Sequence, residues 1–361
     1  MRICFVGPAS SSHIQKWCKW FNTHGHDVHL ISFTDEKVEF AKQYKLNISI
    51  DTHGSEFNKI RYLFTGHEIK KLIRQIDPDI VNAHYATSYG LAMALSGVKG
   101  YILSVWGSDI YDFPKKSKIH KALLKYSLKK AAHIFSTSKA MAIETSKYTE
   151  KDIEITPFGV DVDLFSPTKR NRLNDGRIII GTIKALSDKY GIRNLLEAVA
   201  IVKNKISIPI EVRIGGKGPQ ELEYKRLAEE LKIDDITEWL GLISQDEVAK
   251  EYANMDIAVI PSTLESESFG VSAVEAEASG IAVIVSDIPG LMEATQPNKT
   301  SLVVERKNSG AIAEAIIDLI NDRQKMRDLG VEGRKFASRV YSIDVCFSHI
   351  ENLFIKIACK S

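Results

Sequence analysis

Short apolar segments alternate with amphipathic segments along nearly all of this 361-residue chain. Apolar strands are predicted in the first half at residues 2–6, 28–33, 80–82, 101–105 and 134–137, and in the second half at 177–182, 210–214, 236–240, 257–260, 282–285 and 301–304. Strands that alternate with helices form mainly parallel sheets covered by helices on both faces. The pattern therefore predicts an α/β protein with two doubly wound domains.

A polar segment separates the two predicted domains. Residues 158–177 contain Pro167 and lose apolar periodicity after Phe165, which is typical of a linker. Residues 343–357 are amphipathic again and predict a final helix. We therefore predict a first domain over residues 1–163, a second over 164–340 and a C-terminal helical segment over 341–361.

Composition narrows the class of protein and its compartment. With 44% hydrophobic and 26% charged residues, the chain has the composition of a globular protein, and its net charge of +2 gives no reason to expect a nucleic-acid partner. No apolar run approaches the roughly 20 residues that span a bilayer, and no signal-peptide pattern precedes the first strand. Four cysteines without metal-ligand spacing predict free, buried thiols in a reducing cytoplasm.

The most informative motif is PSTLESESFGVSAVEAEASGIAV, at residues 261–283. Glu267 falls in a loop after a predicted strand, and Glu275 lies eight positions later, about two turns into a predicted helix. Ligands of open α/β sheets bind where loops leave the carboxyl ends of strands and meet helix N-termini. On spacing alone, two solvated glutamates would be the favoured interpretation.

This motif resembles the E-x7-E signature of retaining nucleotide-sugar glycosyltransferases of family 4. The resemblance implies that Glu267 and the backbone of Phe269 and Gly270 hold the donor sugar, and that Glu275 binds the ribose. It also implies the GT-B architecture, in which two Rossmann-like domains face each other across a cleft. The first domain would then bind the acceptor, the second the donor, and the last helix would cross back onto the first domain.

Two lysines follow the first strand of the second domain. Transfer without a metal needs positive groups that stabilise the departing diphosphate. Lys184 and Lys189 occupy the positions where family members carry an arginine and a lysine on this diphosphate. Lysine at position 184 keeps the charge but lacks the bidentate fork of arginine. The alternative is a pair of solvated loop lysines, which the position of Lys184 at a strand end disfavours.

Two glycine-containing loops are further candidates for donor binding. Gly216 and Gly218 lie in a Gly-Gly-Lys-Gly-Pro sequence that lacks the spacing of a dinucleotide motif but matches the Gly-x-Gly-Pro loop of the family. Gly7 opens the loop after the first strand, where relatives often carry two adjacent glycines. His13 stands at the start of the helix that follows and is a further cleft candidate.

The sequence Ser-Val-Trp-Gly-Ser-Asp at residues 104–109 matches a His-Gly-Ser-Asp type motif of the family, with Trp106 in place of the histidine. Asp109 is a candidate for positioning the acceptor hydroxyl or sharing its proton, or alternatively a helix N-cap. His84, just past a strand, is either a cleft residue or a structural histidine. Asp161 and Asp163 form a D-x-D, but its place in the predicted linker argues against a metal site, and we expect none.

A basic amphipathic segment runs from Phe113 to His133. It contains an apolar stripe and no acidic residue, and its seven lysines are at positions 115, 116, 118, 121, 125, 129 and 130. Such a helix can attach reversibly to an anionic membrane, or it can be an ordinary domain helix with a lysine-rich solvent face. Attachment to an anionic membrane would place this cytoplasmic protein on the inner face of the membrane.

We therefore expect a retaining, metal-independent hexosyltransferase that needs no cofactor. It would move a sugar from a nucleotide sugar, with a UDP-sugar favoured, to a hydroxyl of a lipid-linked glycan or polysaccharide precursor. Two alternatives are open. One is a nucleotide-sugar epimerase of the same fold, against which the E-x7-E motif and the lysines argue. The other is a catalytically silent sugar-binding scaffold, for which the substitution at Trp106 leaves room.

Overall fold

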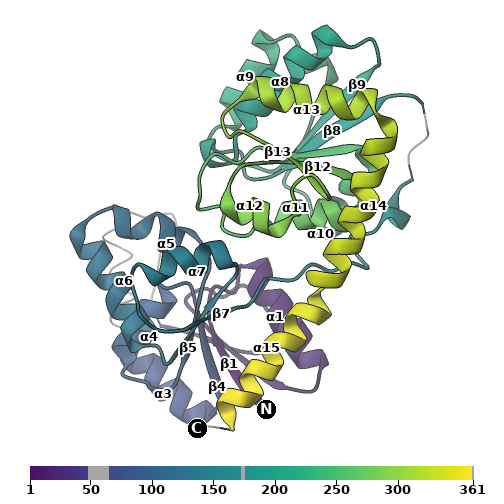
Figure 1. Ribbon diagram of the computed structural model, residues 1–361. Helices are drawn as coiled ribbons and strands as arrows, with labels where there is room; N and C mark the ends of the chain where they lie inside the picture. Colours follow the sequence, from purple (N-terminus) through teal and green to yellow (C-terminus); the bar gives the residue numbers. More distant parts are fainter. Residues whose placement is uncertain (48–64, 172–174, 360–361) are drawn as a thin grey trace. The chain divides into compact units, whose positions relative to one another are not determined.

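The computed structural model describes residues 1–47, 65–171 and 175–359. The chain forms two compact units (Figure 1). Unit 1 comprises Met1–Pro157 together with Phe347–Ser361, and unit 2 comprises Phe158–Cys346. Each unit holds one parallel sheet of its own.

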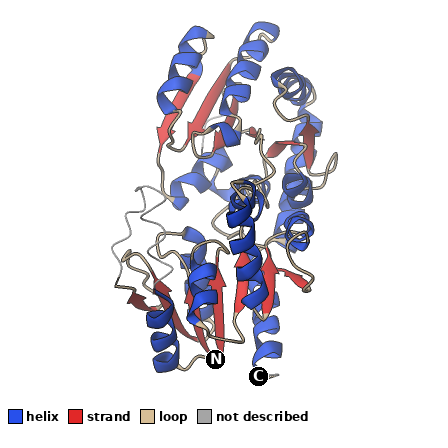
Figure 2. Ribbon diagram, turned by 90° about the vertical axis from the view of Figure 1, so that its left-hand side faces the viewer, coloured by secondary structure: helices blue, strands red, loops and turns tan. Residues whose placement is uncertain are grey.

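Unit 1 contains a seven-stranded sheet with the order β3-β2-β1-β4-β5-β6-β7. The strands are β1 (Arg2–Val6), β2 (Asp27–Ser32), β3 (Lys42–Lys45), β4 (Ile80–His84), β5 (Ile102–Val105), β6 (His133–Ser136) and β7 (Ile153–Ile155). The helices are α1 (Ser12–Thr23), α3 (Gly66–Ile76), α4 (Tyr89–Ser96), α5 (Ser108–Tyr111), α6 (Lys118–Lys130) and α7 (Lys139–Ser146). Four of the five residues of β1 are fully buried, because helices cover both faces of the sheet (Figure 2).

Unit 2 repeats this architecture with the strand order β10-β9-β8-β11-β12-β13. The strands are β8 (Ile178–Ile183), β9 (Ile210–Gly215), β10 (Thr237–Gly241), β11 (Ile257–Ile260), β12 (Ala282–Ser286) and β13 (Ser301–Val304). The helices are α8 (Ile192–Lys205), α9 (Glu221–Glu230), α10 (Gln245–Asn254), α11 (Val271–Ala278), α12 (Pro289–Ala294), α13 (Ser309–Asn321) and α14 (Arg323–Val340).

The strand order reverses once in each sheet. In unit 1 the chain leaves β1 toward β2 on one side, while β4 pairs with β1 on the other. In unit 2 the corresponding neighbours are β8 and β11. Loops diverge at such a switch point, beyond the carboxyl ends of the strands, and open a place for a ligand. The fold therefore directs attention to the loops after β1, β4, β8 and β11.

The last helix, α15 (Ile343–Ala358), begins in unit 2 and belongs to unit 1 from Phe347 onward. Phe347 and Phe354 are both fully buried. The ring of Phe354 lies 5.4 Å from Phe21 and 6.2 Å from Phe135, between centroids. This packing confirms the amphipathic pattern predicted for residues 343–357.

All eleven strands predicted from the sequence are present, and the described residues form two further strands that were not predicted. The additional strands, β3 and β7, are short and have no fully buried residue. They lie at the two edges of the first sheet, where few side chains are buried and the apolar signal is therefore weak. In the described part of the chain, no helix is long and apolar enough to cross a membrane.

All four cysteines are free thiols, as the sequence predicts. Cys4, Cys18 and Cys346 are buried, whereas Cys359 is exposed, which differs from the expectation that all four are buried. Burial raises the pKa of the Cys18 thiol to about 12, so this thiol stays protonated and behaves as a small apolar side chain.

Candidate functional site

The residues of the E-x7-E motif lie at the switch point of unit 2. The strand β11 ends at Ile260, and the following loop carries Glu267 to the start of α11. Gly270 is the N-cap of this helix and has a φ of 76°, a backbone conformation that favours glycine. The Ser272 hydroxyl donates to the carbonyl oxygen of Ile183 at 3.3 Å, which joins the start of α11 to the end of β8.

A buried ion pair connects the two sequence candidates that come from different loops. The Nζ atom of Lys184, after β8, lies 3.0 Å from Oε1 of Glu267, and the two side chains are 11% and 8% exposed. Burial lowers the pKa of Lys184, but the attraction of Glu267, together with Tyr190 and Glu275, outweighs burial and raises the pKa above its ordinary value. Lys184 is therefore a fixed positive charge at this edge of the sheet.

Tyr190 was not identified from the sequence, yet it organises both lysines. Nζ of Lys184 lies 5.0 Å from the centroid of the Tyr190 ring, and Nζ of Lys189 lies 5.3 Å from it. Both contacts are cation–π interactions, which hold the ammonium groups near one another despite their like charge. Lys189 also donates to the carbonyl oxygen of Ser266 at 3.0 Å. The only sequence signal for Tyr190 is its place between the second lysine and Gly191.

Glu275 and Phe269 are both buried, with different consequences. Glu275 is 6% exposed on α11 and acts on the pKa of Lys184, so it belongs to the same charged cluster. Phe269 is 2% exposed, and its ring lies 5.2 Å from that of Tyr341 in an edge-to-face contact. Because this ring is packed in the core, only the backbone of Phe269 is available to a ligand.

The glycine loop after β9 lies against the same strand end. A Cβ atom at Gly216 would overlap the carbonyl oxygen of Lys184, and one at Gly218 would overlap that of Leu186. Leu186 also donates its N–H to the carbonyl oxygen of Lys217 at 3.1 Å. Glycine is therefore required for this loop to approach Lys184, and the structure brings Gly216 and Gly218 beside the charged cluster.

In unit 1, Gly7, His13 and His84 gather at the switch point between β1 and β4. His84 is fully buried, and its ring lies 4.8 Å from Trp17 and 5.5 Å from Trp106. Burial, with a smaller repulsion from His13, lowers the pKa of His84 to about 3. His84 is therefore neutral near pH 7 and enclosed by aromatic rings, which is the geometry of the structural alternative. The partly exposed His13 ring lies 5.8 Å from Trp106.

Asp109 is fully buried and holds the turn after β5. Its carboxylate accepts the backbone N–H of Gly107 at 2.7 Å, of Ala86 at 2.8 Å and of Trp106 at 3.1 Å. Burial raises the pKa of Asp109, and these N–H groups offset part of the increase. The N-cap of the short helix α5 is Gly107 instead, so Asp109 is not the cap that the sequence suggested as an alternative. This geometry suits a residue that positions the Trp106 loop, and a role of Asp109 at the acceptor hydroxyl stays a prediction.

Within residues 1–47, 65–171 and 175–359, no three His, Cys, Asp or Glu side chains gather where they could hold a metal ion. Asp161 of the D-x-D sequence instead accepts the backbone N–H groups of Asp163 at 3.2 Å and Leu164 at 2.9 Å. These bonds are those of a local turn. Metal independence nevertheless stays a prediction that needs a direct measurement.

Comparisons with known proteins agree with this arrangement. The family model described as Glycosyl transferase 4-like matches residues 2–138, and the model described as Glycosyl transferases group 1 matches residues 167–336. Together the two matches cover every strand of both sheets except β7. The solved structure of sucrose-phosphate synthase from Thermosynechococcus elongatus is 19% identical, with a TM-score of 0.86 over 100% of both chains. Anabaena HepE in complex with UDP and glucose is 16% identical, with a TM-score of 0.79 over 99% of this chain and 100% of HepE.

Two relatives illustrate the range of similarity. A GDP-mannose-dependent alpha-(1-6)-phosphatidylinositol monomannoside mannosyltransferase of Mycobacterium tuberculosis is 27% identical over 53% of this chain and 53% of its own length. An uncharacterized glycosyltransferase of Methanocaldococcus jannaschii is 26% identical over 92% of this chain and 90% of its own length. The match therefore spans about half of the first relative and most of the second.

The two parallel-sheet units and their solved neighbours define the class, which is the GT-B fold of glycosyltransferases. Within this class, the chain belongs to the group 1, family 4-like glycosyl transferases. The resemblance deduced from the motifs is thereby confirmed.

Proposed function

We propose that this protein transfers a hexosyl group from a nucleoside-diphosphate sugar to a hydroxyl acceptor, with retention of configuration at the anomeric carbon and without a metal. The observation that carries the proposal is the buried Lys184–Glu267 pair at the carboxyl end of β8, with Lys189 and Glu275 in the same cluster. In this proposal unit 2 binds the donor and unit 1 binds the acceptor.

The cluster contains the charges that such a donor requires. A nucleoside diphosphate gains negative charge as its bond to the sugar breaks, and two fixed ammonium groups stabilise that charge most when it is fully developed. Lys184 and Lys189 are held by the same aromatic ring, which restricts their freedom before the substrate binds. Glu267 and Glu275 supply carboxylate acceptors for sugar and ribose hydroxyls.

The reaction needs no strong base from the protein. The bond between the anomeric carbon and the diphosphate oxygen breaks while the acceptor oxygen bonds to the same face of that carbon. The acceptor proton passes to the departing phosphate oxygen, so charge and atoms balance. This route agrees with the neutral, enclosed His84 and with Asp109, whose oxygens are already bonded to backbone N–H groups.

The donor base is proposed from the neighbours. HepE was solved with UDP and with UDP-glucose, which favours a UDP-sugar. The name of the mycobacterial relative contains GDP-mannose, so guanosine is the competing base. Its name also contains a phosphatidylinositol mannoside, in line with a lipid-linked acceptor or glycan precursor at the inner face of a membrane.

The decisive experiment offers UDP- and GDP-sugars to the protein and follows the product by NMR, which reports whether the anomeric configuration of the donor is kept.

Lys184→Ala should remove about 2–4 kcal/mol of transition-state stabilisation, the scale of one preorganised charge partner. Lys184→Arg should retain most activity because it keeps the charge. Glu275→Ala should weaken nucleotide binding, whereas Glu267→Ala should mainly lower kcat.

Three outcomes would contradict the proposal. The first is an inverted product, and the second is wild-type kinetics for both glutamate variants. The third is activity that is lost in excess chelator and restored by Mg²⁺ or Mn²⁺. Release of a free 2-epimer of the donor without acceptor would instead identify an epimerase, and absence of both transfer and donor hydrolysis would identify a silent scaffold.

A further inference from the structure

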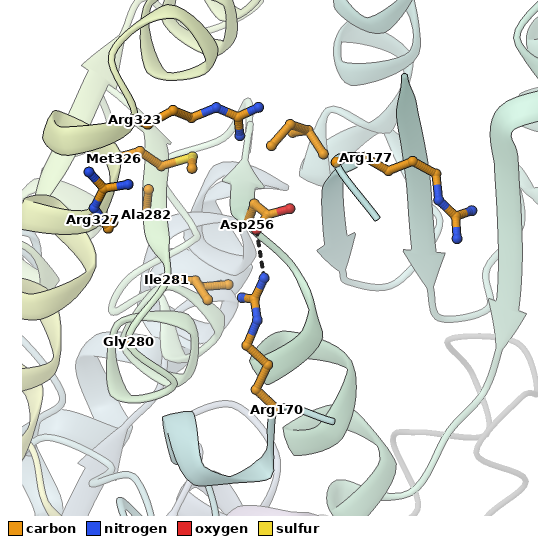
Figure 3. Close-up of a pocket in the computed structure, with 11 residues that line it drawn as sticks. Arg170, Arg177, Asp256, Gly280, Ile281, Ala282, Arg323, Met326 and Arg327 are labelled. Atoms are coloured by element: carbon orange, nitrogen blue, oxygen red, sulfur yellow. Dashed lines mark hydrogen bonds and ion pairs between the residues drawn. The ribbon is translucent and has the colours of Figure 1, made fainter. Parts of the chain in front are cut away.

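A second pocket lies at the opposite edge of the unit 2 sheet. It encloses about 530 Å³ and is lined by residues at the starts of three strands, including Ile178 of β8, Asp256 before β11 and Ala282 of β12 (Figure 3). Because all strands of this sheet are parallel, their starts lie at one edge and the donor cluster lies at the other. At ~3.3 Å per residue, a strand of this length separates the two edges by roughly 15–20 Å.

Arginines dominate this pocket, and two of them already have acidic partners. Arg170 donates to Asp256 at 2.9 Å, the contact that Figure 3 shows as a dashed line, so the one carboxylate in the pocket is neutralised. Arg177 pairs with Glu211 at 2.9 Å, and its side chain extends away from the other labelled residues (Figure 3). Neither arginine leaves an uncompensated charge.

The other two arginines come from the first turns of α14. Arg323 and Arg327 have no carboxylate partner among the residues that the structure describes, although Arg327 donates to the Gln324 side chain at 2.7 Å. They stand four positions apart, so they share a helix face and repel each other. They also lie near the positive end of the helix dipole, where acidic residues are favoured. Local helix electrostatics therefore does not account for them.

Part of the pocket lining is apolar. Met326, Ile178, Ile281 and Ala282 line it beside the two guanidinium groups. An arginine fork matches a phosphate group with two parallel hydrogen bonds, and an adjacent apolar surface accommodates the carbon skeleton attached to that phosphate. A bound phosphate would also remove the repulsion between the arginines.

We propose that this pocket binds a phosphate monoester at a site separate from the donor cluster, with Arg323 and Arg327 as the phosphate ligands. The ligand class is a small organic phosphate, such as a sugar phosphate, or the phosphate headgroup of a lipid. The pocket adjoins Gly280, in the connection from α11 to β12, and α11 carries Glu275. A ligand in this pocket therefore contacts the segment that follows α11, the helix that carries Glu275 of the donor cluster.

Titration calorimetry with glucose 1-phosphate tests the site in the full-length protein. Saturating UDP is included so that the donor cluster does not contribute. The wild-type protein should bind one glucose 1-phosphate, and the double variant Arg323→Gln/Arg327→Gln should bind it at least tenfold more weakly. Arg323→Lys/Arg327→Lys should lie between them, because lysine keeps the charge but loses the fork. Removing two repelling charges should not unfold α14, which circular dichroism verifies.

The matched control is Lys335→Gln on the same helix, a lysine outside this pocket that pairs with Glu332 at 2.8 Å. It should bind like the wild type. Co-sedimentation with phosphatidic acid vesicles is the test for a lipid ligand. If the wild type and Lys335→Gln co-sediment with these vesicles and the double variant does not, the source of the phosphate is a lipid. Equal affinity of wild type and double variant, or no binding of glucose 1-phosphate and of these vesicles by the wild type, would overturn the proposal. The affinities of wild type and double variant for glucose 1-phosphate can be compared even if UDP does not bind, so this test does not depend on the proposed function.

Discussion

Glu277 shares helix α11 with Glu275 but does not belong to the charged cluster. It is fully buried, and its side chain packs against Gly333 of α14. Burial raises the pKa of Glu277 well above its ordinary value of 4.5, and the Thr300 hydroxyl offsets only part of this increase. The folded protein therefore holds the proton on Glu277 to a higher pH than the unfolded chain does.

This difference makes the free energy of unfolding depend on pH. Because the folded state binds more protons than the unfolded state above pH 4.5, stability falls as the pH rises toward the folded pKa. Glu277→Gln removes the titration and keeps a similar shape. We expect the two proteins to have similar free energies of unfolding near pH 4.5. Above pH 4.5 the free energy of unfolding of the variant should rise relative to that of the wild type, by up to about 1.4 kcal/mol per pH unit.

Urea unfolding at pH 5, 7 and 8.5 measures this gain. The exposed Glu314→Gln on α13 serves as the control and should show no comparable trend. A constant difference between wild type and Glu277→Gln across this range would show that the buried carboxyl does not hold its proton in the folded state.

Helix α6 buries one part of its apolar stripe in unit 1 and exposes another part. Leu124 and Leu128 are fully buried in unit 1, so the domain core uses part of the predicted apolar stripe. Ile119, in contrast, is 71% exposed and lies among exposed lysines. Both readings of the sequence therefore find support at different positions of the same helix, and membrane attachment stays a proposal.

If this face meets an anionic membrane, the attraction amounts to about 1 kcal/mol per lysine near the surface. Replacing Lys118, Lys121, Lys125 and Lys129 by glutamine should abolish co-sedimentation with anionic vesicles at low salt and leave nucleotide affinity unchanged. High salt should release the wild-type protein, because exposed charges are screened. The vesicles here lack phosphatidic acid, which separates this test from that of the arginine pocket.

A control with the same change in net charge replaces lysines elsewhere on the surface. Lys147, Lys225, Lys325 and Lys335 each pair with a nearby acid, and their substitution should leave vesicle binding intact. If the wild-type protein binds no such vesicles at any salt concentration, α6 is an ordinary domain helix and the acceptor is better sought among soluble molecules.

On the scale of the whole molecule, the end of the chain completes the first unit. Phe347, Ile350 and Phe354 of α15 are fully buried, and the ring of Phe354 contacts aromatic residues of both α1 and β6. Unit 1 therefore depends on a segment that follows the whole of unit 2 in the sequence. Its core is complete only when α15 has been added to it.

Phe354→Ala should therefore destabilise unit 1 by about 3–5 kcal/mol, the range for truncating a buried phenylalanine. The neighbouring Ile355 is 44% exposed, and Ile355→Ala should change stability by no more than about 0.5 kcal/mol. Denaturant unfolding followed by tryptophan fluorescence measures both changes, because three of the four tryptophans, Trp17, Trp20 and Trp106, lie in unit 1. Similar effects of the two substitutions would contradict the packing described for α15.

Much of the fold is determined locally and could be predicted from the sequence. Central strands such as β11 and β12 are buried on both faces and read as continuous apolar runs, and all eleven predicted segments correspond to observed strands. The edge strands β3 and β7 bury little and left no such signal. The E-x7-E motif and the two lysines were also recognisable, because they lie within short segments of fixed spacing.

Tertiary structure alone decided how these residues meet. Lys184 and Glu267 are 83 positions apart in sequence, and only the neighbouring positions of β8 and β11 bring them to 3.0 Å. The complete burial of Asp109 likewise follows from a turn that wraps its carboxylate with backbone N–H groups. Arg323 and Arg327 face the starts of strands more than 40 residues earlier. Local sequence specifies which elements form, whereas burial and the pairing of distant charges depend on how those elements pack, because both are set by neighbours that the sequence separates.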